Sequence, residues 1–120
     1  VTRFGINPEY FINWIICDFS ISEVDAGDIS FEVARKYVND THTVTEMNLA
    51  IAILRLLEHE KAICEGGGAA GVAAILPGGS LYGKFAGKTV AIPLCGGNID
   101  TTTLGRVIDR GLAADSRLVR

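Results

Sequence analysis

The pattern of hydrophobic and polar positions becomes regular after Gly27. A helix is expected at residues 31–38, capped by Ser30, because its apolar residues fall on one helical stripe. The run His42-Thr43-Val44 is short and β-branched, which favours a strand. The chain therefore opens its regular part with a helix followed by a strand.

A second helix is expected from Glu46 to about Glu60, capped by Thr45. Its apolar residues cover more than one stripe, so most of this helix should be buried. His59 lies near its end and is expected to be solvated or paired with the helix dipole rather than to bind a ligand.

The remaining regular segments alternate between strands and helices. The pattern predicts an extended run, a helix of small residues that can pack closely, an apolar strand and a last helix closed by Gly111. Their expected bounds are Ala62–Glu65, Ala69–Leu76, Thr89–Leu94 and Thr101–Arg110. This alternation predicts the α/β fold class with a largely parallel sheet.

Residues Val1 to Asp25 show no period of 2 or 3.6 despite their many aromatic and β-branched residues. We expect this segment to lie outside the α/β layer. Residues 1–27 therefore remain unassigned to a domain.

Composition excludes several classes of function. The 120 residues are 48% hydrophobic with a formal net charge of −3, which gives no basic surface for nucleic acid. The longest apolar run, Leu49 to Leu54, is far shorter than the roughly 20 residues that span a bilayer. Cys17, Cys64 and Cys95 are odd in number and widely spaced, so we expect no disulfide framework, no metal site and a cytoplasmic location. The first residue is not Met, and the sequence is expected to be a fragment.

Two glycine turns are candidates for ligand binding. Gly66-x-Gly68-x-x-Gly71 fits the dinucleotide fingerprint in its spacing. That fingerprint also requires an acidic residue about 20 positions later. No Asp or Glu occurs between Glu65 and Asp100, so close helix packing explains these glycines better than a nicotinamide cofactor.

The second turn, Cys95-Gly96-Gly97-Asn98, follows an apolar strand, at the end of which open α/β sheets place ligands. Pro93 removes one ladder donor, which indicates a strand near the sheet edge or a bulge. Cys95 is equally consistent with a thiol facing a ligand and with a small buried hydrophobic residue.

The segment from Val38 to Arg120, above all VAIPLCGGNIDTTTLGRVIDRGLAADSRL, resembles the C-terminal part of pyridoxal-phosphate-dependent threonine and serine dehydratases and of serine racemase. The resemblance implies a portion of a fold-type II catalytic domain, related to tryptophan synthase β, at residues 28–111. It also implies an open, mostly parallel twisted sheet with helices on both faces.

The resemblance assigns a cofactor-binding role to four residues. Cys95 stands where the family has a serine or cysteine that hydrogen-bonds the pyridine nitrogen, and Gly96 follows it. Glu65 matches the family's glutamate at the start of the helix that packs beside the cofactor, and Gly66 lies in the loop after it. A thiol does not protonate the ring nitrogen as a carboxylate would, which favours β-elimination.

The same resemblance places other parts of the site upstream of this sequence. The Schiff-base lysine, the phosphate-binding run of four glycines and the divalent-cation site have no counterpart here, so no catalytic residue is assigned. The chain's lysines lie in unrelated contexts, namely Lys36, Lys61, Lys84 and Lys88. Residues 112–120 resemble a junction toward a regulatory domain.

The function implied by the resemblance is that of a lyase that converts L-threonine or L-serine to a 2-oxo acid and ammonia in the complete enzyme. The implied partners are the hydroxy amino acid and further copies of the subunit, with neither nucleic acid nor membrane. Serine racemisation, a non-catalytic α/β interaction module and a nonfunctional truncated product remain alternatives. This chain alone is expected to be inactive.

Overall fold

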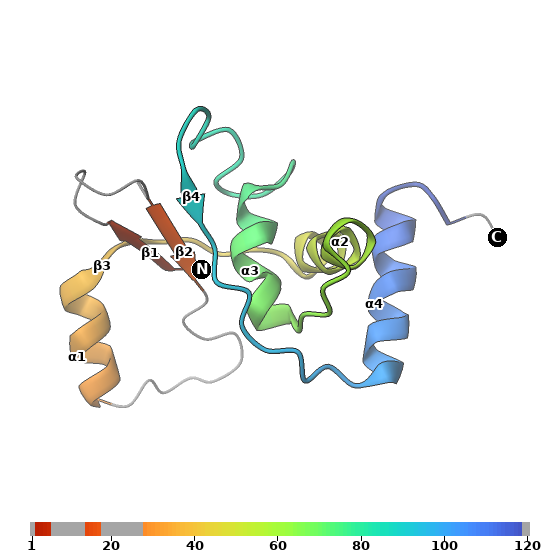
Figure 1. Ribbon diagram of the computed structural model, residues 1–120, viewed down its shortest axis with the longest axis horizontal. Coiled ribbons are helices and arrows are strands. Elements are labelled where there is room, and N and C mark those ends of the chain that lie inside the picture. Colours follow the sequence, from red (N-terminus) through yellow and green to blue (C-terminus); the bar gives the residue numbers. More distant parts are fainter. Residues whose placement is uncertain (1, 6–13, 18–27, 119–120) are drawn as a thin grey trace.

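The computed structural model describes residues 2–5, 14–17 and 28–118, with the small sheet and the first helix on one side and the later helices on the other (Figure 1). In chain order the elements are β1 (Thr2–Gly5), β2 (Trp14–Cys17), α1 (Asp28–Tyr37), β3 (Val38–Thr41), α2 (Glu46–Arg55), the π-helical turn η1 (Leu56–Glu60), α3 (Gly66–Ile75), β4 (Val90–Ala91) and α4 (Thr101–Ala114).

Helix α2 is the centre of the helical part and packs against both α3 and α4 (Figure 1). Thr45 caps it by accepting a hydrogen bond from the backbone N–H of Asn48, as the sequence predicts. The predicted burial is also confirmed, because most of the apolar residues of α2 and η1 are inaccessible to solvent. These are Leu49, Ala50, Ala52, Ile53, Leu54 and Leu56.

Helix α3 packs closely because its side chains are small. Ala69, Ala70, Ala73 and Ala74 are almost fully buried, which confirms the close packing expected from the sequence. Alanine positions cost little side-chain entropy on burial, so the backbone of α3 can lie directly against its neighbours. The chain then reverses beyond α3, and the backbone N–H of Leu81 donates to the carbonyl of Ala74 at 2.8 Å.

Helix α4 is longer than the sequence predicts. Asp100 caps its start by accepting from the backbone N–H of Thr103, and the helix continues through Gly111 to Ala114. The expectation that Gly111 closes the helix is therefore wrong. Gly111 is buried against α2, where a Cβ atom would lie 2.9 Å from the carbonyl oxygen of Ala50. The close contact between α4 and α2, rather than the end of a helix, explains the glycine at this position.

The sheet has the strand order β3-β1-β2-β4. β1 pairs antiparallel with both β2 and β3, and only β2 and β4 are parallel, so the largely parallel sheet that the alternation predicts is not the sheet observed in the described residues. Both antiparallel pairs involve β1, which comes from the segment that we left unassigned and lies between β3 and β2 in the sheet. The expectation that residues 1–25 lie outside the layer is wrong for residues 2–5 and 14–17.

Three predicted strands differ in their bounds. Strand β3 precedes rather than includes residues 42–44, and residues 62–65 are extended without forming a strand. Strand β4 covers only Val90–Ala91 of the predicted run and lies at the sheet edge, in agreement with the missing N–H of Pro93. The first helix begins at Asp28, so Ser30 lies within it rather than at its cap.

No helix in the described part of the chain is long and apolar enough to cross a membrane.

Candidate functional site

The predicted site residues meet where the loop after β4 passes the N-terminus of α3 (Figure 1). The backbone N–H of Glu65 donates to the carbonyl of Gly96 at 3.0 Å. Glu65 is the N-cap residue of α3 and Gly66 is the first residue of that helix. The structure thus brings Glu65 and Gly66 next to Gly96 and its neighbour Cys95, although 29 or more positions separate the two segments.

Gly96 is required at this contact for two reasons. Its φ of +79° lies in the left-handed region, which non-glycine residues rarely adopt. A Cβ atom would also overlap the side-chain carboxyl group of Glu65, which lies directly over this position. The carboxyl group of Glu65 makes no cap hydrogen bond to α3. The turn after β4 therefore depends on a glycine that faces Glu65.

Gly68 provides the second close approach between the same two segments. A Cβ atom there would overlap the carbonyl group of Cys95 and the thiol of Cys64. Gly68 is buried in the first turn of α3, so its missing side chain lets the loop lie against the helix. The packing explanation that the sequence favoured for this glycine is confirmed.

Cys64 is a residue of this contact that the sequence reasoning missed. Its thiol is 2% exposed and donates to the carbonyl of Cys95 at 3.7 Å. Burial raises the pKa of the Cys64 thiol, and the nearby negative charge of Glu65 acts in the same direction. Cys64 is therefore a neutral donor that holds the loop. The feature of the sequence that could have identified Cys64 is its position directly before Glu65.

Cys95 itself is exposed and forms no disulfide. The interpretation of this residue as a small buried hydrophobic group is therefore wrong for this structure. Because its backbone carbonyl is held by Cys64 while the residue is exposed to solvent, the thiol remains available in the loop after β4. A weak donor and acceptor at this point can hydrogen-bond one heteroatom of a ligand.

These features define a class of protein first: an α/β chain in which a glycine turn after the last strand packs against the start of a helix. The chain is 47% identical to the L-threonine ammonia-lyase of Thermotoga maritima over 93 residues, which is 78% of this chain and 22% of that protein. It is 40% identical to the L-threonine ammonia-lyase of Geobacter sulfurreducens over 91 residues, 76% of this chain and 22% of that protein.

A catabolic L-threonine dehydratase of Staphylococcus aureus is 34% identical over 96 residues, 80% of this chain and 27% of that protein. No protein-family model matches the chain. The chain thus spans about a quarter of the length of these relatives. Similarity to threonine ammonia-lyases over most of this chain confirms the resemblance inferred from its sequence.

Proposed function

We propose that this chain is the C-terminal part of the catalytic region of a threonine ammonia-lyase and that the Glu65–Gly96 contact forms one wall of its pyridoxal phosphate site. The observation that supports this most directly is the exposed Cys95 thiol beside the start of α3, in a sequence similar to two L-threonine ammonia-lyases. The complete protein would convert L-threonine to a 2-oxo acid and ammonia.

The residues present fit the cofactor's pyridine nitrogen. Cys64 is already engaged with a backbone carbonyl and is buried, whereas the thiol of Cys95 is exposed. A pyridine nitrogen needs one hydrogen-bond partner, and a thiol can supply it. The backbone of Gly96 carries no side chain that would keep a flat ring away from the turn.

The protein's contribution to the chemistry follows from these placements. Pyridoxal phosphate supplies the electron sink for elimination from an amino acid. The thiol of Cys95 would hydrogen-bond the ring nitrogen without giving it a full positive charge, because a thiol is a weak acid. Glu65 supports the turn that carries this thiol by donating its backbone N–H to Gly96. The lysine that would bind the cofactor covalently is expected outside these 120 residues.

The test uses the complete protein that contains this sequence, with its 2-oxo acid and ammonia production from L-threonine measured together with cofactor affinity. Cys95→Ala removes one hydrogen bond worth roughly 0.5–1.5 kcal/mol, so cofactor affinity should fall about two- to tenfold. Cys95→Ser keeps a donor and an acceptor and is the matched control. Unchanged affinity and turnover in Cys95→Ala, or a complete protein that releases no ammonia from threonine, would refute the proposal.

A further inference from the structure

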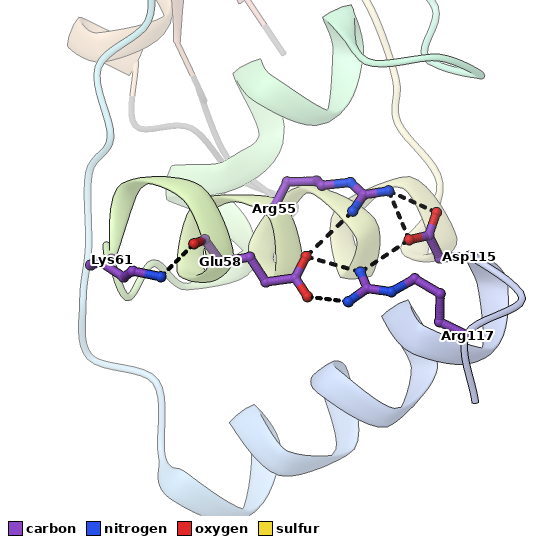
Figure 2. A network of polar contacts seen from close by, with 5 residues as sticks. All are labelled: Arg55, Glu58, Lys61, Asp115 and Arg117. Atoms are coloured by element: carbon purple, nitrogen blue, oxygen red, sulfur yellow. Dashed lines mark hydrogen bonds and ion pairs between the residues drawn. The ribbon is translucent and has the colours of Figure 1, made fainter. Parts of the chain in front are cut away.

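Four charged side chains form a closed ring between the end of α2 and the end of α4 (Figure 2). The guanidinium of Arg55 donates to both carboxylate oxygens of Asp115 at 2.7 and 2.8 Å and reaches Glu58 at 3.3 Å. Arg117 donates to both oxygens of Glu58 at 2.5 and 3.0 Å and to Asp115 at 3.2 Å. Each acid thus bonds both arginines.

The ring is partly shielded from water. The exposed fractions of the side chains are 34% for Arg55, 28% for Glu58, 22% for Asp115 and 42% for Arg117. The hydrogen bond from Arg117 lowers the pKa of the Glu58 carboxyl group, and Glu58 raises the pKa of Arg117 in turn. Bidentate arginine–carboxylate contacts fix the relative orientation of the two groups as well as pairing their charges. The ring therefore fixes the position of the end of α4 relative to the end of α2.

The ring is built on η1, an unusual turn. Arg55 directly precedes this π-helical turn, and Glu58 lies in its middle. π-Helical turns are rare and often occur at functional sites. A π turn contains one more residue than an α turn, so a change to α-helical geometry would shift the register of every residue that follows.

The exit from η1 is strained and depends on Glu58. Lys61 has a φ of +56°, a conformation that is costly for a residue with a side chain. Its amide and that of Ala62 both donate to the carbonyl of Leu56, and its ammonium group donates to the carbonyl of Glu58 at 2.6 Å. A strained residue persists when its surroundings hold it, and here Glu58 is held by the ring.

The segment that leaves this exit leads directly to the candidate site. Cys64 and Glu65 follow Lys61 by three and four residues, and they carry the two contacts to the Cys95–Gly96 turn. Within the described part of the chain no strand pairs with residues 62–65, so their register is set by the exit from η1 at one end and by α3 at the other.

We propose that the ring of Arg55, Glu58, Asp115 and Arg117 positions the candidate site. It holds η1 as a π turn and thereby sets the register in which Cys64 and Glu65 meet the turn after β4. Arg117 and Asp115 act through Glu58 and touch no ligand, so they are positioning residues. The effect on turnover rests on the proposed function, whereas the effect on position is testable on this chain without any ligand.

The experiment measures how fast iodoacetamide modifies Cys64 in the folded chain. After trypsin digestion, Cys64 falls in residues 62–84 and Cys95 in residues 89–106, so mass spectrometry follows the two thiols separately. Arg117→Met opens the ring and keeps a long side chain. Arg110→Met is the matched control, because Arg110 is an exposed arginine of α4 outside the ring.

We expect Arg117→Met to speed modification of Cys64 by about threefold or more, with Cys95 unchanged. Hydrogen exchange should rise at residues 56–65 and stay constant at the buried alanines of α3. Arg117→Lys keeps the positive charge without the bidentate contact, so its rate of Cys64 modification should lie between those of the wild type and Arg117→Met. Arg110→Met should match the wild type.

Two results would overturn the proposal. One is an unchanged Cys64 rate in both Arg117 variants. The other is an equal rise in hydrogen exchange throughout α2 and α3, which would mean that the ring acts only on global stability. Because no cofactor is used, either result leaves the proposed function standing, and loss of the proposed function would leave this positional effect intact.

Discussion

Replacing Gly111 with alanine tests whether the contact between α2 and α4 sets the position of α4. Gly111 is buried in the last turn of α4, where alanine would by itself be the better residue by about 1 kcal/mol. The new Cβ atom, however, would lie 2.9 Å from the carbonyl oxygen of Ala50 and 3.1 Å from two side-chain carbons of Leu54. The backbone of α2 would have to move to accept it.

Inserting one methyl group into a packed contact costs about 1–3 kcal/mol. Against the gain in helix propensity, Gly111→Ala should change stability by about 0 to −2 kcal/mol. Gly105 in the same helix is the matched control, because it is exposed and a Cβ atom there would meet nothing within 4 Å. Gly105→Ala should therefore stabilise the chain by about 1 kcal/mol.

Urea unfolding followed by circular dichroism measures both variants against the wild type. The sign of the difference is the test, because both variants make the same chemical change in the same helix. We expect Gly111→Ala to unfold at a lower urea concentration than Gly105→Ala, by the equivalent of about 1–3 kcal/mol. Equal stabilisation by the two substitutions would show that α4 does not pack on α2 through Gly111.

Three further predictions concern the candidate site, the ring and a helix cap. Gly96→Ala should open the contact with Glu65, because Gly96 has a φ of +79° and a Cβ atom would overlap the carboxyl group of Glu65. Hydrogen exchange of residues 95–98 should therefore rise, and protection equal to the wild type would contradict this prediction. The pKa of Glu58 is lowered in the folded chain, mainly by Arg117. The ionised carboxylate therefore stabilises the fold fully above the ordinary glutamate pKa of about 4.3, and this stabilisation is lost as the pH falls below that value. Glu58→Gln should flatten the acid side of a stability–pH curve, and an unchanged slope would contradict a stabilising role of the ring. Thr45→Ala removes the cap of α2 and should lower the free energy of unfolding by about 1 kcal/mol, whereas Thr45→Ser, measured in the same urea titration, should cost little.

The sequence predicts the helices well because their signals are local. The run from Glu46 to Glu60 has its cap residue, its apolar positions and its polar end in one stretch, and the structure forms a helix there. The sheet was predicted poorly because strand pairing joins distant segments. Nothing local in Trp14–Cys17 indicates that this segment pairs with Val90–Ala91.

The site was predicted in part. The family resemblance singled out Cys95, Gly96 and Glu65, which lie together in the structure, and their binding of a cofactor stays a prediction. The role of Cys64 depends on a backbone carbonyl 31 positions away, and the ring around Glu58 depends on a side chain 59 positions away, and no local pattern encodes either contact. Gly111 shows the same limit, because a helix-ending glycine and a glycine at a helix contact look alike in sequence.

The last prediction is that this chain by itself does not carry out ammonia-lyase chemistry. A lysine that binds pyridoxal phosphate covalently must be desolvated or activated by a neighbouring group. The four lysines of the chain are exposed: Lys36 lies over the ring of Tyr37, Lys61 donates to the carbonyl of Glu58, and Lys84 and Lys88 lie in the loop before β4. None is in the segments that meet at the candidate site.

The measurement is reduction of the chain with borohydride in the presence of pyridoxal phosphate, followed by mass spectrometric mapping and an assay for ammonia released from threonine. We expect substoichiometric labels scattered over several lysines and no ammonia, because exposed amines react slowly and without selection. Lys84→Arg and Lys88→Arg should each remove only their own share of the label. One lysine labelled to completion together with ammonia release would show that the chain holds a catalytic lysine of its own, and the assignment of that residue to a position outside these 120 residues would then be wrong.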